Sequence, residues 1–249
     1  MAKEAYIITG ASKGIGFEWS RQLNEQGHQV IGIARTKPEN WPYDNFLAFD
    51  LTKLDAIEDI MGQALKWISK DTETIVLVNN AGTIEPIGFA HTNDTAQVSQ
   101  SIVLNLTAPM LLCGAFIAQL KDRSSHKKII NISSGAGRKA YEGWSAYCAG
   151  KAGLDHFSSC LDAENADVKV VSVAPGIIDT GMQEKIRQSE AADFPLLEKF
   201  LHYKENGLLS SPEETAAMLM DMTQRPDFNK LPTILDIRNL PAIGEGQLE

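Results

Sequence analysis

The chain has 249 residues and a formal net charge of −9 at pH 7. This length can bury the core of one large α/β domain, and no linker rich in Pro, Gly or Ser divides it. The acidic balance argues against nucleic acid or an anionic membrane surface as a partner, because such surfaces bind clustered Lys and Arg.

The sequence shows neither an export signal nor a membrane span. The first residues, Met1 to Ile8, lack a basic segment followed by an apolar one, and no run of about 18 apolar residues is present. The cysteines Cys113, Cys148 and Cys160 form no CxxC pair and show no metal-ligand spacing. We therefore expect a cytoplasmic protein with free thiols and no metal site.

Short β-rich segments alternate with longer helical patterns along the chain. Strands are predicted at residues 5–10, 28–35, 45–50, 74–80, 127–134, 168–176 and 232–237, and helices near 15–27, 53–70, 93–121, 145–166 and 212–224. The strands are continuous runs of Val, Ile and Leu, which is typical of strands buried on both faces of a parallel sheet. The pattern predicts one doubly wound α/β domain over residues 1–249, with about seven parallel strands and helices on both faces.

The first strand runs into the glycine-rich segment "TGASKGIG", Thr9 to Gly16. Its glycines permit a tight turn and a close approach of the backbone to a diphosphate, which the N-terminus of the next helix would face. The spacing departs from G-x-G-x-x-G and lacks the ending of a P-loop. Such a segment alone can be an ordinary turn, but the strand before it and the helix after it favour a dinucleotide site.

The second strand ends at Arg35, where an NAD-specific site carries an acidic residue that accepts from the ribose hydroxyls. With Lys13 of the glycine turn, Arg35 can form a cationic clamp for a 2′-phosphate, because a guanidinium binds phosphate oxygens in a bidentate fork. The alternative is that both are solvated surface charges. We expect NADP(H) as the cofactor.

Three further strands end in polar or glycine-rich segments: "NNAG" at 79–82, "NISS" at 131–134 and "APG" at 174–176. Ligands of open α/β sheets bind outside the carboxyl ends of the strands. The sequence therefore predicts that the glycine turn and these segments form one site at one edge of the sheet.

The segment "SAYCAGKAG" places Tyr147 four residues before Lys151 on a predicted helix, so the two side chains share a face. A cation about 5 Å away, at an effective dielectric constant near 20, favours a phenolate by roughly 3 kcal/mol, or about two pK units. We expect Lys151 to lower the pKa of Tyr147 toward useful acidity. Ser134, at a strand end, can donate to a substrate carbonyl oxygen that Tyr147 protonates.

The connection from about 179 to 211 is unusually long for such a fold. We expect a substrate-binding lid that carries its own helices rather than a passive loop. Trp144, Tyr141, Met182 and Phe194 either line an aromatic substrate pocket under this lid or pack as ordinary core side chains.

These motifs, in this order and spacing, resemble the short-chain dehydrogenase/reductases over nearly the whole chain. The resemblance implies a Rossmann fold with Asn105, Ser134, Tyr147 and Lys151 as the catalytic residues. Lys151 would also hold the nicotinamide ribose, and Asn105 would position a water in a proton relay to it. The implied partners are a small carbonyl substrate and a second copy of the chain, with a homodimer favoured.

The resemblance also implies which residues surround the cofactor. Asp50 matches an adenine contact, Asn79 and Gly82 match a cofactor wall, and Ile177 and Thr180 would meet the nicotinamide carboxamide. The full expected cofactor set is Gly10, Ser12, Lys13, Gly14, Ile15, Gly16, Arg35, Thr36, Asp50, Leu51, Asn79, Asn80, Ala81, Gly82, Tyr147, Lys151, Pro175, Gly176, Ile178, Thr180 and Met182.

A narrower resemblance lies in "EGWSAYCAGKAGLDHF" and "APGIIDTGMQEKIR", which are similar to the sepiapterin and benzil reductase branch. It implies an NADPH-dependent carbonyl reductase of vicinal dicarbonyls with Tyr147 as proton donor. The residues expected at the substrate are Ser134, Trp144, Tyr147, Gly176, Met182 and Asp236, the last as a possible pterin anchor. The alternatives are a family member acting on sugars, steroids or acyl groups, and a non-catalytic NADP-binding regulator.

Overall fold

The computed structural model describes residues 4–41 and 44–240. This part of the chain contains a seven-stranded parallel sheet in the order β3-β2-β1-β4-β5-β6-β7. The strand order reverses between β1 and β4, which is where doubly wound sheets bind their ligands. The predicted α/β fold is confirmed. The strands are β1 (Glu4–Thr9), β2 (Gln29–Ala34), β3 (Phe46–Ala48), β4 (Thr74–Asn79), β5 (His126–Ile132), β6 (Val168–Ala174) and β7 (Ile234–Asp236).

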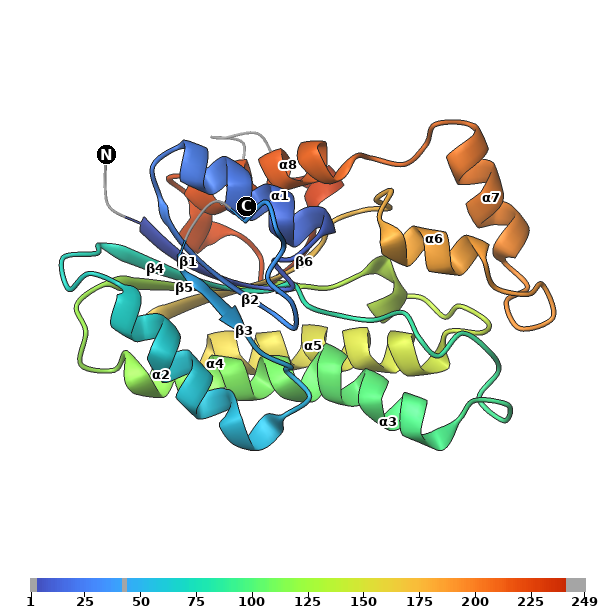
Figure 1. The fold of residues 1–249 in the computed structure, drawn as a ribbon, viewed down its shortest axis with the longest axis horizontal. Helices are drawn as coiled ribbons and strands as arrows, with labels where there is room; N and C mark the ends of the chain where they lie inside the picture. The colour runs from blue at the N-terminus through green and yellow to red at the C-terminus, as the bar shows by residue number, and fades with distance from the viewer. Residues whose placement is uncertain (1–3, 42–43, 241–249) are drawn as a thin grey trace.

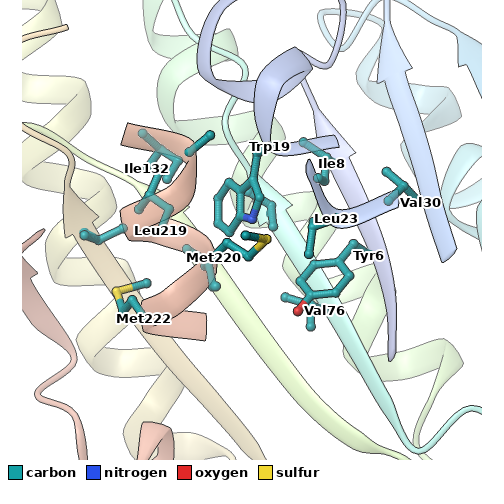
Figure 2. Close-up of a cluster of buried hydrophobic side chains, with 14 of the residues drawn as sticks. Tyr6, Ile8, Trp19, Leu23, Val30, Val76, Ile132, Leu219, Met220 and Met222 are labelled. Carbon is teal, nitrogen blue, oxygen red and sulfur yellow. The ribbon is translucent and has the colours of Figure 1, made fainter. Parts of the chain in front are cut away.

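Helices cover both faces of the sheet (Figure 1). One face carries α1 (Gly14–Glu25) and α8 (Pro212–Gln224), and the other carries α2 (Ile57–Trp67), α4 (Ala108–Gln119) and α5 (Ser145–Glu164). Alternation along each strand divides the core into two layers, because successive side chains point to opposite faces. Figure 2 shows the α1–α8 layer, where the indole of Trp19 lies between Met220 of α8 and Ile8 of β1.

The predicted helix at 93–121 contains a break in its regular winding. It consists of α3 (Thr95–Ile102), a π-helical turn at Val103–Thr107 and α4. A π-turn inserts an extra residue into a helix and often occurs at functional sites. Here it carries Asn105, whose buried amide donates to the Thr83 carbonyl and accepts from the Thr83 N–H. Hydrophobic periodicity alone does not reveal such an insertion, so the π-helical turn was not predicted.

The stretch Thr95–Gln119 is also long and apolar enough to cross a membrane, with a mean hydropathy of 1.9 in its most apolar window. This differs from the expectation that no such segment is present. In the structure the α4 part of the stretch packs in the core, where Leu112, Cys113 and Phe116 are buried, while 39% of the apolar window as a whole is buried. Its apolar character follows from that packing and from exposed side chains on its outer side, Met110 and Leu111.

The long connection at 179–211 holds two helices, α6 (Gly181–Arg187) and α7 (Leu197–Glu205). They lie together past one end of the sheet (Figure 1). Asp179 forms ion pairs with Lys204 of α7 and Arg187 of α6, and Lys185 of α6 pairs with Glu85 in the loop after β4. These ion pairs therefore join α6 to α7 within the segment and join the segment to the loop after β4.

Candidate active site

The residues expected at the cofactor follow the carboxyl ends of five strands, and the structure gathers those ends at one edge of the sheet. The carboxyl ends align because every strand pairing is parallel. After β1 come Gly10, Ser12, Lys13, Gly14, Ile15 and Gly16; after β2, Arg35 and Thr36; after β3, Asp50 and Leu51; after β4, Asn80, Ala81 and Gly82; and after β6, Pro175, Gly176, Ile177, Ile178 and Thr180, with Met182 in α6.

The β1–α1 turn is built so that only glycine fits at two of its positions. Gly10 has φ +67°, a left-handed conformation that side chains disfavour. A Cβ on Gly16 would lie 2.5 Å from the Gly10 carbonyl oxygen and 2.5 Å from Asn80 Nδ2. Asn80 braces the turn, since its amide donates to the Thr9 carbonyl at 2.9 Å. The two glycines therefore let the turn pack tightly against the end of β4.

The N-terminus of α1 is suited to an anion. Lys13 at the cap position makes no side-chain cap, and the first turn of the helix holds no acidic residue. The first N–H groups thus lack a capping carboxylate or hydroxyl, and a phosphate can accept from them. Lys13 and Arg35 are both exposed, and neither forms an ion pair within the described residues. The uncapped N-terminus of α1 is suited to a dinucleotide diphosphate.

Asp50, the expected adenine contact, and Asn79, an expected cofactor-wall residue, differ in the direction and the hydrogen-bond partners of their side chains. The Asp50 carboxylate accepts from the Thr52 N–H at 3.0 Å and the Thr52 hydroxyl at 2.9 Å, and these bonds hold the pKa of Asp50 below its usual range. The side chain of Asn79 is 2% exposed and donates to Asn131 Oδ1 at 2.8 Å. Asn79 therefore points into the interior, and its expected place in the cofactor wall is corrected: burial on the α4–α5 side of β4 decides its direction.

Sequence reasoning missed Thr9, the residue before the glycines. Its buried hydroxyl accepts from the N–H groups of Asn80 and Ala81 and donates to the Val78 carbonyl. Thr9 thereby locks the β4 end against the β1 end. Its place at the start of "TGASKGIG" could have pointed to it, but hydrogen bonds to backbone groups about 70 residues away cannot be predicted from the sequence.

Tyr147 and Lys151 lie on one face of α5, as predicted. The Lys151 Nζ lies 5.8 Å from the centroid of the Tyr147 ring and donates to the Ile132 carbonyl at the end of β5 at 2.8 Å. Both side chains are buried, at 5% exposure for Lys151 and 7% for Tyr147. Ser134 follows β5, where its hydroxyl accepts from the Ala136 N–H at 3.1 Å.

The expected lowering of the Tyr147 pKa is wrong for this structure. Burial raises the pKa of the phenol to about 12, and the Ser134 side chain offsets this only in part. Burial also lowers the pKa of Lys151 to about 8. Desolvation disfavours the charged form of each group, and it is the largest influence on both pKa values. The phenol is thus held protonated at neutral pH.

Asn105 and Gly82 complete this part of the site. A Cβ on Gly82 would lie 2.8 Å from Asn105 Oδ1 and 3.6 Å from Lys151 Nζ, so the backbone after β4 passes directly over both side chains. The structure therefore brings Asn105, which comes from the π-turn, next to Lys151 of α5.

The aromatic residues expected at the substrate form a packed cluster beneath α6 and α7. Trp144 stacks on Phe194 at a centroid distance of 4.6 Å and meets the Tyr147 ring edge-on at 5.9 Å. Phe194 is fully buried and Trp144 is 4% exposed. Phe194 is therefore a core side chain, whereas Tyr141 and Met182 are partly buried at the margin of the cluster. Of the two readings, packing holds for Phe194.

Asp236 does not present a free carboxylate to a substrate. Its two oxygens accept from Arg238 Nε at 2.8 Å and Arg238 Nη2 at 2.6 Å, which keeps its pKa below the usual range. A cation two residues away thus occupies this carboxylate, and the expected contact of Asp236 with a substrate stays a prediction. Gly176 lies beside the same arginine, whose Cδ would lie 3.5 Å from a Cβ on this glycine.

Comparisons with known proteins agree with this geometry. A family model described as short chain dehydrogenase matches residues 4–191. An (S)-benzoin-forming benzil reductase of Bacillus subtilis is 39% identical over 232 residues, covering 91% of this chain and 96% of the relative. Sepiapterin reductase of Mus musculus is 35% identical over 241 residues, covering 89% and 92%.

Among solved structures, a short-chain dehydrogenase/reductase from Saccharomyces cerevisiae matches with a TM-score of 0.82 at 27% identity, covering 98% of each chain. The family model covers most of the chain and the sequence relatives span nearly all of it. This chain therefore belongs to the short-chain dehydrogenase/reductase family, in the branch of the benzil and sepiapterin reductases.

Proposed function

We propose that this oxidoreductase is an NADPH-dependent carbonyl reductase that reduces one carbonyl of a vicinal dicarbonyl to an alcohol. The observation that carries the proposal is the buried pair Tyr147 and Lys151, with Ser134 at the phenol. A protonated phenol beside a buried ammonium is suited to giving a proton to an oxygen that gains negative charge.

The cofactor fits the residues at the edge of the sheet. The glycine turn and the N-terminus of α1 would hold its diphosphate, and Lys13 and Arg35 its 2′-phosphate. Lys151 would hold the nicotinamide ribose. When bound, the reduced cofactor supplies the hydride that reaches the carbonyl carbon.

Each catalytic residue then acts on the oxygen of that carbonyl or on the proton supply. Tyr147 donates its phenolic proton to the oxygen, and Ser134 donates a hydrogen bond to it. Lys151 stabilises the phenolate that remains, since the ammonium lies 5.8 Å from the ring centroid. Asn105 lies next to Lys151 and would position a water that returns the proton.

The substrate class is supported by the surroundings of Tyr147 and by the relatives. Trp144 packs edge-on against the Tyr147 ring, and the partly buried Tyr141 and Met182 at the margin of the same cluster supply apolar surface for an aromatic substrate. Benzil reductases and sepiapterin reductases are the relatives reported above. We propose that the segment at 179–211 is the substrate lid, held by the ion pairs of Asp179 and Lys185.

We also propose a homodimer. The outer side of α4 exposes Met110 at 40% and Leu111 at 43%, two large apolar side chains that a second copy would cover.

A panel of carbonyl compounds tests the proposed activity. Oxidation of NADPH is followed by absorbance with benzil and an aliphatic vicinal diketone, against a monoketone, an aldose, a steroid ketone and an acyl thioester. We expect the highest kcat/KM with the vicinal diketones. A preference for the sugar, the steroid or the acyl compound would reject the substrate class while keeping carbonyl reduction, and absence of turnover with tight NADPH binding would indicate a binding protein.

Cofactor choice depends on Arg35. In Arg35→Asp, we expect kcat/KM for NADPH to fall by roughly 100-fold while that for NADH changes little, because a phosphate loses a bidentate cation and meets a carboxylate. The measurement is the ratio of kcat/KM for the two cofactors with one diketone. Lys37→Asp, an exposed cation two residues further along, is the matched control. An unchanged ratio in Arg35→Asp would remove Arg35 from the site.

A further inference from the structure

Asp155 is a buried carboxylate one helical turn after Lys151 on α5. It is 5% exposed, and both of its oxygens are bonded: Oδ1 accepts from the Ser172 hydroxyl at 2.6 Å and Oδ2 accepts from Arg138 Nε at 3.0 Å. Residues four apart on a helix are neighbours on its surface, about 5–6 Å between Cβ atoms. The Asp155 carboxylate therefore lies one helical turn from Lys151, on the side away from Tyr147, and its charge acts on the buried ammonium without an ion pair between them.

A buried ammonium needs a compensating charge to stay protonated. Burial acts to lower the pKa of Lys151, and the charge of Asp155 acts in the opposite direction. The charged and titratable groups around the pair are Tyr147 on α5, Arg138 after the Ser134 turn, and Asp236 of β7, which interacts with Arg138. The Ile132 carbonyl adds a neutral acceptor to Lys151 Nζ.

Arg138 connects this carboxylate to two other parts of the site. It ends the short 3₁₀ turn that Ser134 caps, and its Nη2 donates to the Leu235 carbonyl in β7 at 3.1 Å. Ser172, the other partner of Asp155, lies in β6, which pairs with β7. The Asp155 side chain thus links α5 to β6 through Ser172, and to the Ser134 turn and β7 through Arg138.

We propose that Asp155 is a positioning residue that acts through Lys151: its carboxylate, held by Arg138 and Ser172, keeps charged the Lys151 ammonium that donates to the end of β5. The electrostatic part stands without any assumption about the reaction, whereas its catalytic consequence rests on the proposed carbonyl reductase function. Asp155 touches neither substrate nor reacting atoms in this assignment and acts through Lys151.

The direct test is an NMR titration of the Lys151 side chain in the free protein. The Cε–Hε resonance of Lys151 is assigned by its loss in Lys151→Met and followed against pH. In Asp155→Asn we expect the titration midpoint to fall by about one pH unit, because the ammonium loses its negative neighbour. In Arg138→Gln we expect it to rise, because a competing cation is removed.

The opposite signs separate electrostatics from damage to the fold. Loss of a structural bond would affect both variants alike, whereas a change in charge moves the midpoint down in one and up in the other. Asp162→Asn is the matched control. This carboxylate also lies on α5, nearer its C-terminal end, and it accepts hydrogen bonds from Lys169, the Val170 N–H and Thr233. Its removal is expected to leave the Lys151 midpoint unchanged.

Turnover supplies the second readout. If protonated Lys151 is required, the apparent pKa of the high-pH limb of kcat/KM falls by the same one pH unit in Asp155→Asn. With a wild-type pKa of about 8, kcat/KM near pH 8 then falls about fivefold. Asp155→Glu is expected to restore most of it. A Lys151 midpoint that stays in place in Asp155→Asn overturns the inference even if the enzyme reduces carbonyls; a moved midpoint without turnover on any carbonyl retains it and rejects the proposed function instead.

Discussion

Tyr147→Phe is expected to lower kcat/KM for diketone reduction by about 10³-fold or more while leaving NADPH affinity within about threefold. General acid catalysis by a positioned side chain contributes roughly 10²–10⁴-fold, and removal of the phenol hydroxyl removes the whole of it. The phenyl ring keeps its edge-on contact with Trp144, since that contact does not involve the hydroxyl. Steady-state rates of diketone reduction measure kcat/KM, and fluorescence titrations with NADPH measure the affinity for the cofactor.

The control for this variant is Tyr6→Phe. It also removes a buried phenol hydroxyl, which in this case donates to Glu4 at 2.6 Å, but it lies on β1 in the α1–α8 core layer (Figure 2). A loss of stability without loss of turnover is expected there. Retention of full turnover in Tyr147→Phe would show that another group supplies the proton.

Lys151→Met is expected to lower kcat/KM by about 10³-fold and to weaken NADPH binding, yet to leave the fold as stable as before near neutral pH. The ammonium is buried with its pKa lowered to about 8, so folding costs free energy to keep it charged. Methionine fills a similar volume without a charge. Asp155 retains Arg138 and Ser172 as partners. Rates, NADPH titrations and urea unfolding measure these three effects.

The same variant gives a pH dependence with a definite sign. Because the folded-state pKa of Lys151 lies near 8 and its ordinary value is 10.5, the unfolded chain binds more protons in that interval. The free energy of unfolding of the wild type should therefore rise relative to Lys151→Met between pH 8 and 10.5, by up to about 3 kcal/mol. Lys66→Met, at an exposed position on α2, should show a flat difference. A flat difference for Lys151→Met would mean that the ammonium is solvated.

The sequence by itself determined the fold and the chemistry available at the strand ends. Continuous Val, Ile and Leu runs predict strands buried on both faces, and the structure confirms one parallel sheet between two helical layers. The predicted helix near 212–224 is α8, and its start is fixed locally, since Ser211 and Glu214 form a capping box with Pro212 between them. These signals are local, since they depend on residues within a few positions of each other.

Only the tertiary structure decided how the polar residues are used. Asn79 and Asn80 are adjacent in sequence, but Asn79 ends β4 and bonds inward to Asn131, whereas Asn80 follows the strand and braces the glycine turn. Asp236 pairs with Arg238, and Asp155 with Arg138, although all four are simply charged residues in the sequence.

The protonation of Tyr147 is the clearest case of a property that sequence cannot give. Spacing places an ammonium near the phenol and predicts a lower pKa, but burial under the packed aromatic cluster raises the pKa to about 12. Attraction between two side chains is set by helix geometry, which is local, whereas desolvation is set by everything that packs around them. The sequence therefore specified which groups meet, and the tertiary structure decided their charge.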